Sequence, residues 1–211
     1  MVDLESSRKE IAELVEAFAE NEYYYKSNDF DEENAKVKFI SKFFKILGWD
    51  VDNEENRAPQ YADVEFEDSV KISGKTKSPD YCFRYWGERK FFVEAKAPHE
   101  NIEKNRDHAF QLKRYTWSAK LPLGILTDFE ELAIYEPKVV PKKHQNTTID
   151  RIKYYNYKDY VENWDEIYNL FSREAIKKGK FDNFIENVHG DRKGTEIVDS
   201  EFLKTIETWR L

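Results

Sequence analysis

The chain has 211 residues and a formal net charge of −8 at pH 7, with 40% hydrophobic and 36% charged residues. This length suffices for one domain with a sizeable core, and no apolar run approaches the roughly 20 residues that a membrane-spanning helix needs. The single cysteine excludes an internal disulfide framework, and the acidic N-terminal segment is unlike a signal peptide, so we expect a cytoplasmic protein without a membrane partner.

The first part of the chain predicts two amphipathic helices. In the first helix, apolar residues recur at helical spacing: Ile11, Leu14, Val15 and Phe18. The second helix covers residues 35–50, "AKVKFISKFFKILGWD", and Gly48 is expected to end it. Its predicted apolar stripe consists of Val37, Ile40, Phe44 and Leu47.

The middle of the chain predicts strands around a single helix. Residues 61–73 alternate loosely between apolar and polar, and two apolar runs follow at 80–86 and 90–96. A helix is expected over residues 103–120, and the segments "LGILTD" and "ELAIYE" after it are short apolar strands. This order predicts an α/β domain around a mixed sheet, with helices on both faces.

The pattern weakens beyond residue 138. It predicts a polar loop, a Tyr-rich segment over residues 154–160, and a helix near 162–177. A last helix is expected from about residue 199, with an apolar side that consists of Phe202, Leu203, Ile206 and Trp209.

The runs 80–86 and 90–96 predict a hairpin whose two faces differ. With Gly87-Glu88-Arg89 as a three-residue loop, the pairs on one face are all apolar: Tyr81 with Ala95, Phe83 with Val93 and Tyr85 with Phe91. The other face then pairs Asp80 with Lys96, and Cys82 with Glu94. A shift of one residue would mix polar and apolar residues on both faces, so burial favours the first register.

Asp80, Glu94 and Lys96 therefore share one face of the predicted hairpin, a set suited to metal-assisted phosphoryl chemistry. Mg²⁺ prefers oxygen ligands, polarises a phosphoryl oxygen and lowers the pKa of a bound water. A nearby lysine can hold that water and offset charge that builds on the phosphate. We interpret Asp80 and Glu94 as metal ligands and Lys96 as the catalytic lysine. The structural alternative is a cross-strand ion pair between Asp80 and Lys96 at a solvated strand end.

Pro79-Asp80 followed by Glu94-Ala95-Lys96 resembles the motif of the PD-(D/E)XK nucleases. Residues 109–136, "AFQLKRYTWSAKLPLGILTDFEELAIYE", are similar to the segment after this motif in the N-terminal nuclease domains of type IIG restriction-modification enzymes. Within that segment, Gln111 to Tyr115 is similar to the Gln-x-x-x-Tyr motif of type I restriction subunits. Residues 31–53, "DEENAKVKFISKFFKILGWDVDN", resemble the entry helix of the same domains, and the tail resembles their connection to a methyltransferase region.

This resemblance implies an α/β fold with a restriction-endonuclease-like core, which is a mixed central β-sheet flanked by helices, and helical N- and C-terminal extensions. Residues 1–30 would form the N-terminal extension, and 31–140 the nuclease core. Residues 141–211 would form a mainly helical connector toward a methyltransferase region. The last predicted helix has no residue that would end it before Leu211, so we expect the chain to be a fragment of a longer protein.

The resemblance also implies further site residues. Gln111 and Tyr115 share one face of their predicted helix and would line the site. An acid of the entry helix would be a further catalytic residue and metal ligand. Glu32 is the preferred candidate, and Glu33 is the alternative. The structural alternatives are helix-surface hydrogen bonding for Gln111 and Tyr115, and a favourable position at a helix N-terminus for the two acids.

The sequence thus predicts a Mg²⁺-dependent DNA endonuclease domain, the cleavage module of a type IIG restriction-modification enzyme. It would be a type II site-specific deoxyribonuclease that acts on double-stranded DNA, and Mn²⁺ is expected to substitute for Mg²⁺. Expected partners are methyltransferase and target-recognition regions of the same longer chain, and a second copy for double-strand cleavage. The rival functions are a catalytically inactive DNA- or protein-binding module on the same fold, and a structure-specific repair nuclease.

The distribution of charge weakens the argument that an acidic chain avoids DNA. From Arg84 to Lys120 there are nine Lys and Arg residues against five acids. Lys113 and Arg114 are candidates for phosphate contacts, and a solvated helix face is the alternative. Core or interface positions are expected for all the tryptophans: Trp49, Trp86, Trp117, Trp164 and Trp209.

Overall fold

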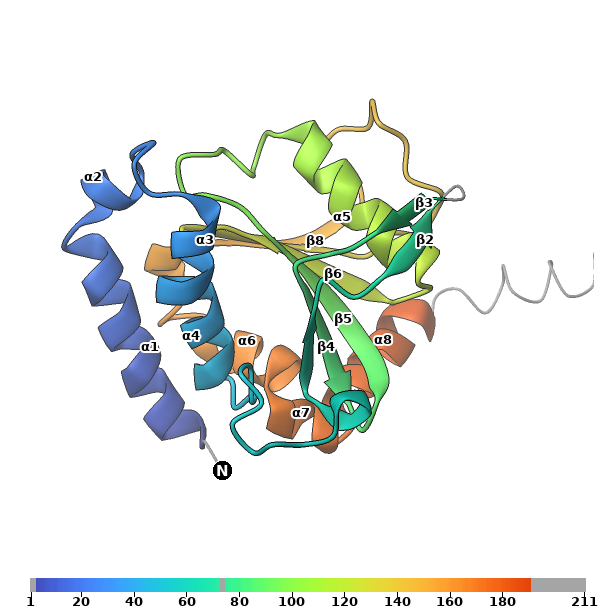
Figure 1. Cartoon of the computed structure of the whole chain (residues 1–211), viewed down its shortest axis with the longest axis horizontal. Coiled ribbons are helices and arrows are strands. Elements are labelled where there is room, and N and C mark those ends of the chain that lie inside the picture. Colours follow the sequence, from blue (N-terminus) through green and yellow to red (C-terminus); the bar gives the residue numbers. More distant parts are fainter. Residues whose placement is uncertain (1–2, 73–74, 191–211) are drawn as a thin grey trace, which may run out of the picture.

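The structure is a computed structural model, and it describes residues 3–72 and 75–190. A mixed six-stranded sheet lies at the centre of this part of the chain (Figure 1). Its strand order is β1-β4-β5-β6-β7-β8, and neighbours are antiparallel except for the parallel pair β5 and β6. The strands are β1 (Val64–Phe66), β4 (Tyr81–Tyr85), β5 (Glu88–Ala95), β6 (Leu123–Thr127), β7 (Glu131–Tyr135) and β8 (Arg151–Asn156). A separate hairpin consists of β2 (Val70–Ile72) and β3 (Lys75–Lys77).

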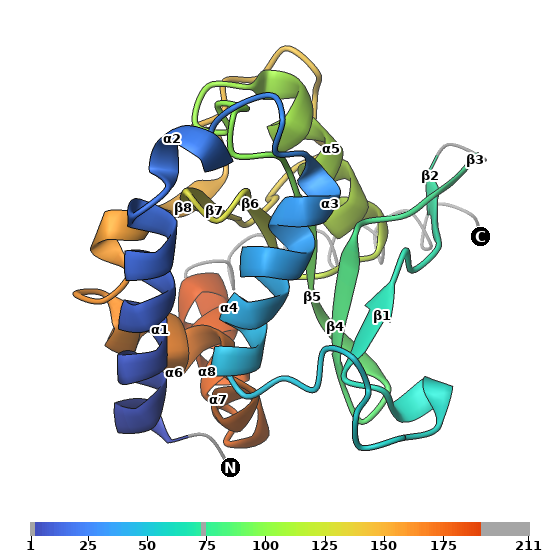
Figure 2. The same cartoon turned by 60° about the vertical axis from the view of Figure 1, so that its left-hand side comes forward.

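Helices cover both faces of the sheet (Figures 1 and 2). One side carries α1 (Leu4–Ala19), α2 (Glu22–Tyr25), α3 (Glu32–Ala35), a π-helix (Lys36–Ile40), α4 (Ser41–Ile46), α6 (Trp164–Phe171), α7 (Arg173–Lys177) and α8 (Lys180–Gly190). The other side carries α5 (Arg106–Ser118), which connects the parallel strands β5 and β6. Short 3₁₀ turns lie at Pro59–Tyr61 and Tyr157–Asp159. None of the described helices is long and apolar enough to cross a membrane.

Alternating side chains of β4 and β5 enter two separate cores, one on each face of the sheet. On the side of α4, the rings of Phe83 and Phe91 stack with centroids 4.8 Å apart, and the ring centroids of Phe44 and Phe83 are 4.4 Å apart. On the side of α5, Phe92 packs in a cluster with Leu112. The predicted α/β fold, a mixed sheet with helices on both faces, is confirmed.

The β4–β5 hairpin has the predicted faces but not the predicted register. Its turn is Trp86-Gly87, and Phe83 pairs with Phe91 instead of Val93. Trp86 and Gly87 have φ values of 51° and 82°, as a two-residue hairpin turn requires, but a bulky residue is not expected at positive φ. The two-residue turn alone would shift the pairing by three residues, but an irregularity between Phe83 and Arg84 reduces the shift to two over residues 81–83, so the same side chains still share each face there.

The predicted second helix is divided into α3, the π-helix and α4. The predicted stripe is correct at Ile40, Phe44 and Leu47, which are buried, but wrong at Val37, which is 70% exposed. Phe39 is buried instead. The wider π turn contains an additional residue, so it shifts the apolar side relative to that of a regular α-helix.

The Tyr-rich segment contributes a strand that the sequence pattern does not predict. β8 pairs with β7 at the edge of the sheet, and most of its side chains are only half-buried, which weakens the alternation that would reveal a strand. The predicted helix near 162–177 is two helices, because Ser172 adopts an extended conformation and caps α7. The predicted last helix lies outside the described residues.

The tryptophans divide into two groups. Trp49 and Trp164 are buried as predicted, and their indole N–H groups donate to the carbonyl oxygen of Phe171 and to Oγ of Ser7, both at 2.8 Å. Trp86 is 72% exposed in its turn and Trp117 is 38% exposed, so neither lies in the core, and the alternative of an interface position stays a prediction. Residue 209 is outside the described part.

Candidate active site

Two adjacent strand ends position the predicted acids. Asp80 immediately precedes β4, and its Oδ2 accepts the backbone N–H of Ala95 at 2.8 Å, so the carboxylate continues the pairing between β4 and β5. On the other edge of β5, the backbone N–H of Lys96 donates to the carbonyl oxygen of Thr127 at 2.9 Å. Glu94 and Lys96 therefore lie on backbone that is held from both sides.

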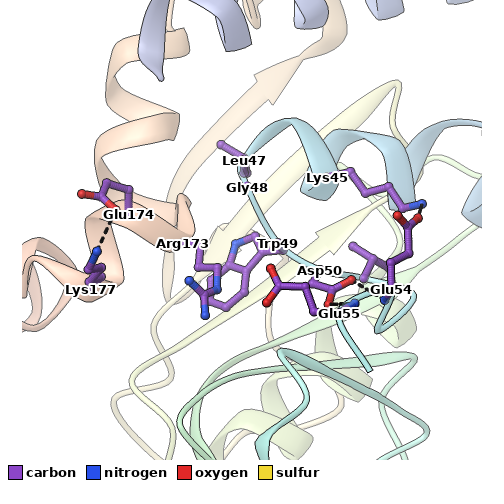
Figure 3. A pocket seen from close by; sticks show the side chains of 11 residues that line it. Lys45, Leu47, Gly48, Trp49, Asp50, Glu54, Glu55, Arg173, Glu174 and Lys177 are labelled. Atoms are coloured by element: carbon purple, nitrogen blue, oxygen red, sulfur yellow. Dashed lines mark hydrogen bonds and ion pairs between the residues drawn. The ribbon is translucent and has the colours of Figure 1, made fainter. Parts of the chain in front are cut away.

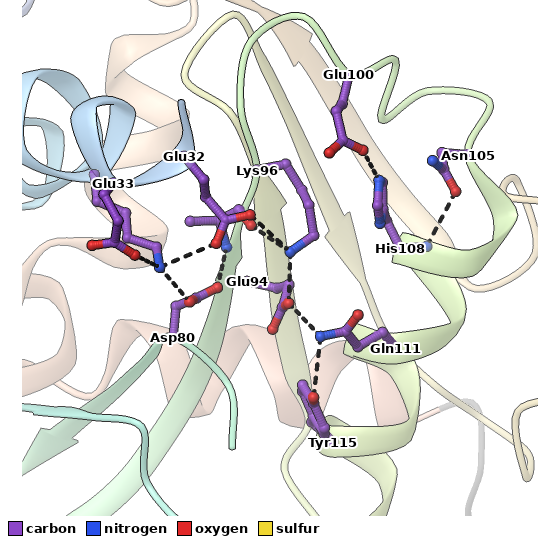
Figure 4. Close-up of polar contacts among 12 residues, drawn as sticks. Glu32, Glu33, Asp80, Glu94, Lys96, Glu100, Asn105, His108, Gln111 and Tyr115 are labelled. Atoms are coloured by element: carbon purple, nitrogen blue, oxygen red, sulfur yellow. Dashed lines mark hydrogen bonds and ion pairs between the residues drawn. The ribbon is translucent and has the colours of Figure 1, made fainter. Parts of the chain in front are cut away.

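Lys96 contacts two of the predicted acids (Figure 4). Its Nζ donates to Glu94 Oε1 at 2.8 Å and to the carbonyl oxygen of Ala95 at 2.6 Å, and it lies 3.4 Å from Glu32 Oε2. Burial disfavours the charged amine, but Glu94, Glu32 and Asp80 outweigh it and raise the pKa of Lys96. The alternative interpretation, a cross-strand ion pair between Asp80 and Lys96, is wrong, because Asp80 pairs with a different lysine.

That lysine is Lys36, which the sequence reasoning missed. Its Nζ lies 2.7 Å from Asp80 Oδ1, 2.8 Å from Glu33 Oε1 and 3.1 Å from Glu32 Oε1. The spacing from Glu32 and Glu33 to Lys36 is i to i+4 and i to i+3, a pattern that places side chains together on a helix surface. This pattern could have identified the contact with the two glutamates, but not the contact with Asp80.

The acids of α3 differ in position. Glu32 is one-third exposed and lies between Lys36 and Lys96, whereas the side chain of Glu33 is 78% exposed and contacts Lys36. Asp31 begins the helix, since its carboxylate accepts the backbone N–H of Asn34. Of the two candidate acids, Glu32 is therefore the one that contacts the predicted catalytic lysine.

Glu94 is the most perturbed acid of this group. Its side chain is 3% exposed, and its Oε2 is buried without a hydrogen-bond partner among the described residues. Burial, followed by repulsion from Asp80, raises the pKa of Glu94 to about 7, although Lys96 acts in the opposite direction. An additional cation would relieve both the repulsion and the unpaired oxygen.

Gln111 and Tyr115 lie beside Glu94. Gln111 Nε2 donates to Glu94 Oε1 at 2.5 Å and lies 3.1 Å from the hydroxyl oxygen of Tyr115 (Figure 4). Both residues come from one face of α5, so this helix fixes the orientation of the Glu94 carboxylate. The pKa of Tyr115 is raised by burial and by the charge of Glu94, which keeps the hydroxyl protonated.

The predicted metal ligands do not form a three-ligand cluster. Within the part of the chain that the structure describes, no group of three or more His, Cys, Asp or Glu side chains is arranged to hold a metal ion. The ammonium groups of Lys36 and Lys96 lie between the carboxylates instead. The unpaired Glu94 Oε2 and the raised pKa of Glu94 nevertheless fit a site that accepts a cation.

A groove with a volume of about 400 Å³ adjoins the carboxylates and shares Gln111 and Tyr115 with them. It is lined by Lys77, Asp107, Phe110, Gln111, Arg114, Tyr115 and Lys143. Arg114 is thus in a position to contact a phosphate. Lys113 is not, because it is 1% exposed and its Nζ lies over the Tyr135 ring and near the carbonyl oxygen of Ile149.

A second hollow, of about 450 Å³, lies between the end of α4 and α7 (Figure 3). Its lining includes Trp49 and Arg173, and none of the predicted site residues. Arg173 donates from Nε to Oδ2 of the buried Asp63 at 2.6 Å, and its backbone N–H donates to the carbonyl oxygen of Leu47 at 2.9 Å. These contacts connect α7 to the sheet and to α4, which is a structural role.

Comparison with known proteins gives one informative similarity. The chain is 35% identical over 208 residues to the type II restriction enzyme and methyltransferase RM.Eco57I from Escherichia coli. This supports a restriction-enzyme-related domain. The match covers 98% of this chain and 21% of the relative, so the chain spans about a fifth of that enzyme's length. No protein-family model and no solved structure matches the chain.

Proposed function

We propose that the chain is a Mg²⁺-dependent DNA endonuclease domain of the PD-(D/E)XK type, and the cleavage module of a type IIG restriction-modification enzyme. The observation that carries this proposal is the convergence of Asp80, Glu94 and Lys96 at the ends of β4 and β5, with Glu94 Oε2 unpaired among the described residues. The similarity to a restriction enzyme and methyltransferase supports it independently.

In this proposal, Asp80 and Glu94 hold the metal, and Glu32 is a further ligand. When bound, Mg²⁺ polarises a phosphoryl oxygen and lowers the pKa of a coordinated water, and Mn²⁺ substitutes for it. Carboxylates on adjacent strand ends suit this task, because their separation is set by backbone hydrogen bonds and not by a flexible loop.

Lys96 would act directly on the reacting groups, whereas Gln111 would act only through Glu94. The raised pKa of Lys96 keeps its amine protonated at neutral pH, so it can donate a hydrogen bond to the attacking water or to a phosphate oxygen. Gln111 donates to the same Glu94 oxygen as Lys96 does, and so holds that carboxylate in one orientation. Tyr115 contacts Gln111 from the groove side.

The groove beside the site supports DNA as the substrate. It carries the cations Lys77, Arg114 and Lys143 against the single acid Asp107. Positive side chains next to a carboxylate centre can position a phosphate backbone while the net charge of the chain stays at −8. The methyltransferase and target-recognition regions would then belong to the rest of a longer enzyme. The relative is described as a restriction enzyme and methyltransferase, and the match covers 21% of its length.

A plasmid-nicking assay with the purified protein tests the proposal. In Mg²⁺ we expect the parent protein to nick the plasmid. The nicking rate of Lys96→Met should be about 10²–10³-fold lower, which is the usual effect of removing one group that stabilises charge in the transition state. Asp80→Asn should be inactive. The matched control is Lys90→Met, which removes a buried lysine of β5 that pairs with Glu88 and Asp182 away from the site.

Three outcomes would contradict this proposal: nicking in EDTA, parental activity in Lys96→Met, or an equal loss in Lys90→Met. DNA binding without nicking by the parent protein would favour the inactive binding module. Equal cleavage of methylated and unmethylated host DNA, with preference for branched substrates, would favour a repair nuclease.

A further inference from the structure

Lys36 occupies an unusual position for a helix-surface lysine. Its side chain is 17% exposed, and its Nζ contacts carboxylates of three residues, Asp80, Glu33 and Glu32. Burial disfavours the charged amine, but its hydrogen bonds to the carboxylates of Asp80 and Glu33 outweigh this effect and raise the pKa of Lys36 well above its ordinary value. The amine therefore stays protonated and places a positive charge inside the carboxylate cluster.

Both oxygens of Asp80 are engaged in this arrangement. Oδ2 accepts the Ala95 N–H, which belongs to the strand pairing, and Oδ1 accepts Lys36 Nζ. The oxygen that can be released without breaking the β4–β5 pairing is thus the one that Lys36 holds. A divalent cation and an ammonium group on the same oxygen would repel each other strongly in a partly buried site.

The backbone around Lys36 also favours a side chain that can exchange partners. Lys36 is the first residue of the π-helix between α3 and the core-packed α4, and such turns frequently occur at functional sites. Its flexible four-carbon stem can move the amine outward, where the largely exposed Glu33 already provides a partner at 2.8 Å. The amine can therefore leave Asp80 without leaving all of its carboxylates.

We propose that Lys36 is the counter-cation of the metal-free site. It neutralises Asp80 until Mg²⁺ displaces it from Oδ1, and so it sets the Mg²⁺ concentration at which the site fills. This inference rests on the proposed metal site. It assigns to Lys36 a role in metal affinity that is separate from the role of Lys96 toward the reacting groups.

Isothermal titration with MgCl₂, at constant ionic strength and without DNA, tests this role. In Lys36→Met the competing amine is absent, so we expect the Mg²⁺ dissociation constant to fall by about tenfold, the scale of one charge-assisted hydrogen bond. The matched control is Lys45→Met. Lys45 is on α4 and also pairs with two acids, Asp52 and Glu54, but away from the site, so its loss should leave the constant within about twofold of the parent.

Thermal melts separate this role from a purely structural one. Lys36→Met should lower the melting temperature in EDTA, because the carboxylates lose their counter-cation, and the loss should shrink in saturating Mg²⁺. An equal loss in both conditions with an unchanged dissociation constant would overturn the inference. If Lys36→Met does not fold, Glu33→Gln removes the exposed partner that receives the displaced amine, so it should weaken Mg²⁺ binding by about twofold. Unchanged or tighter binding in Glu33→Gln would contradict the inference.

The results also distinguish the two proposals from each other. A parent protein that binds no Mg²⁺ would overturn the proposed metal site and the role of Lys36 together. A parent protein that binds Mg²⁺ with the same affinity as Lys36→Met would overturn only the role of Lys36.

Discussion

Glu94 combines burial, a like charge and an unpaired oxygen in one side chain. Its Oε1 accepts hydrogen bonds from Lys96 and Gln111, whereas its Oε2 is buried without a hydrogen-bond partner in the described part of the chain. The nearby Asp80 disfavours a second negative charge, and the pKa of Glu94 is raised to about 7. Without a metal ion this residue therefore destabilises the folded protein whenever it is ionised.

The pH dependence of stability should show this cost. The pKa of Glu94 rises from an ordinary 4.5 to about 7 on folding. Its stabilising contribution to the free energy of unfolding is therefore fully present below about pH 4.5 and is lost as the pH rises through about 7. In EDTA, the unfolding free energy of the parent relative to Glu94→Gln should fall by up to about 3 kcal/mol from about pH 5 to about pH 8. Urea denaturation at several pH values measures this difference.

Glu166 provides the matched control. Burial acts against its ionisation, but hydrogen bonds from Lys153 and Tyr155 lower its pKa from 4.5, so it stays ionised over this range. The difference between the parent and Glu166→Gln should accordingly be flat between about pH 5 and about pH 8. A flat profile for Glu94→Gln as well would mean that Glu94 is not perturbed.

At the scale of elements, the packing of α5 on β6 determines where Gln111 and Tyr115 lie. Gly124 in β6 lies directly under α5, and an added Cβ there would be 2.4 Å from Thr116 Oγ1 and 2.9 Å from Leu112 Cδ1. The helix can approach the sheet this closely because residue 124 has no side chain. The distance from Gln111 to Glu94 depends on that approach.

Gly124→Ala should therefore destabilise the protein and displace α5. We expect a loss of about 1–3 kcal/mol in the free energy of unfolding, the usual cost of overpacking, together with slower plasmid nicking. Gly179→Ala is the comparison, because a Cβ there meets no atom within 4 Å and the strain comes only from φ +71°. It should cost about 1 kcal/mol and leave nicking unchanged. Parental nicking in Gly124→Ala would show that the position of α5 does not affect the site.

At the scale of the whole molecule, the site lies where elements from distant parts of the chain meet. The strand ends of β4 and β5 supply Asp80, Glu94 and Lys96, α3 supplies Glu32, and α5 supplies Gln111 from the opposite face of the sheet (Figure 4). The carboxylates assemble only in the folded chain. A cation that binds them therefore binds the folded state in preference to the unfolded state.

Mg²⁺ should stabilise the fold as a consequence. At 100 times its dissociation constant, we expect an increase of about 2.7 kcal/mol in the free energy of unfolding relative to EDTA at the same ionic strength. Asp80→Asn should abolish this increase, whereas Asp182→Asn, which removes a carboxylate paired with Lys90 outside the site, should retain it. Identical urea denaturation curves of the parent protein in Mg²⁺ and in EDTA would argue against a preformed metal site.

Much of the site could be predicted because it depends on short-range patterns. A period of two along β4 and β5 assigns Phe83 and Phe91 to one face and Asp80 and Glu94 to the other, and a shift by an even number of residues leaves that assignment intact. Helical spacing likewise places Gln111 and Tyr115 on one side of α5. Local periodicity alone thus determined which side chains can meet.

The tertiary structure alone decided which of these side chains do meet. Trp86 adopts a positive φ that no local preference indicates, and so the hairpin has a two-residue turn and a shifted register. The predicted partner of Asp80 is Lys96, but Lys36 takes that place, since a contact across 44 residues depends on how the π-helix packs against the sheet. β8 joins the sheet through pairing with β7 in spite of weak alternation. Long-range contacts depend on the energy of the whole fold, and no sequence window contains that information.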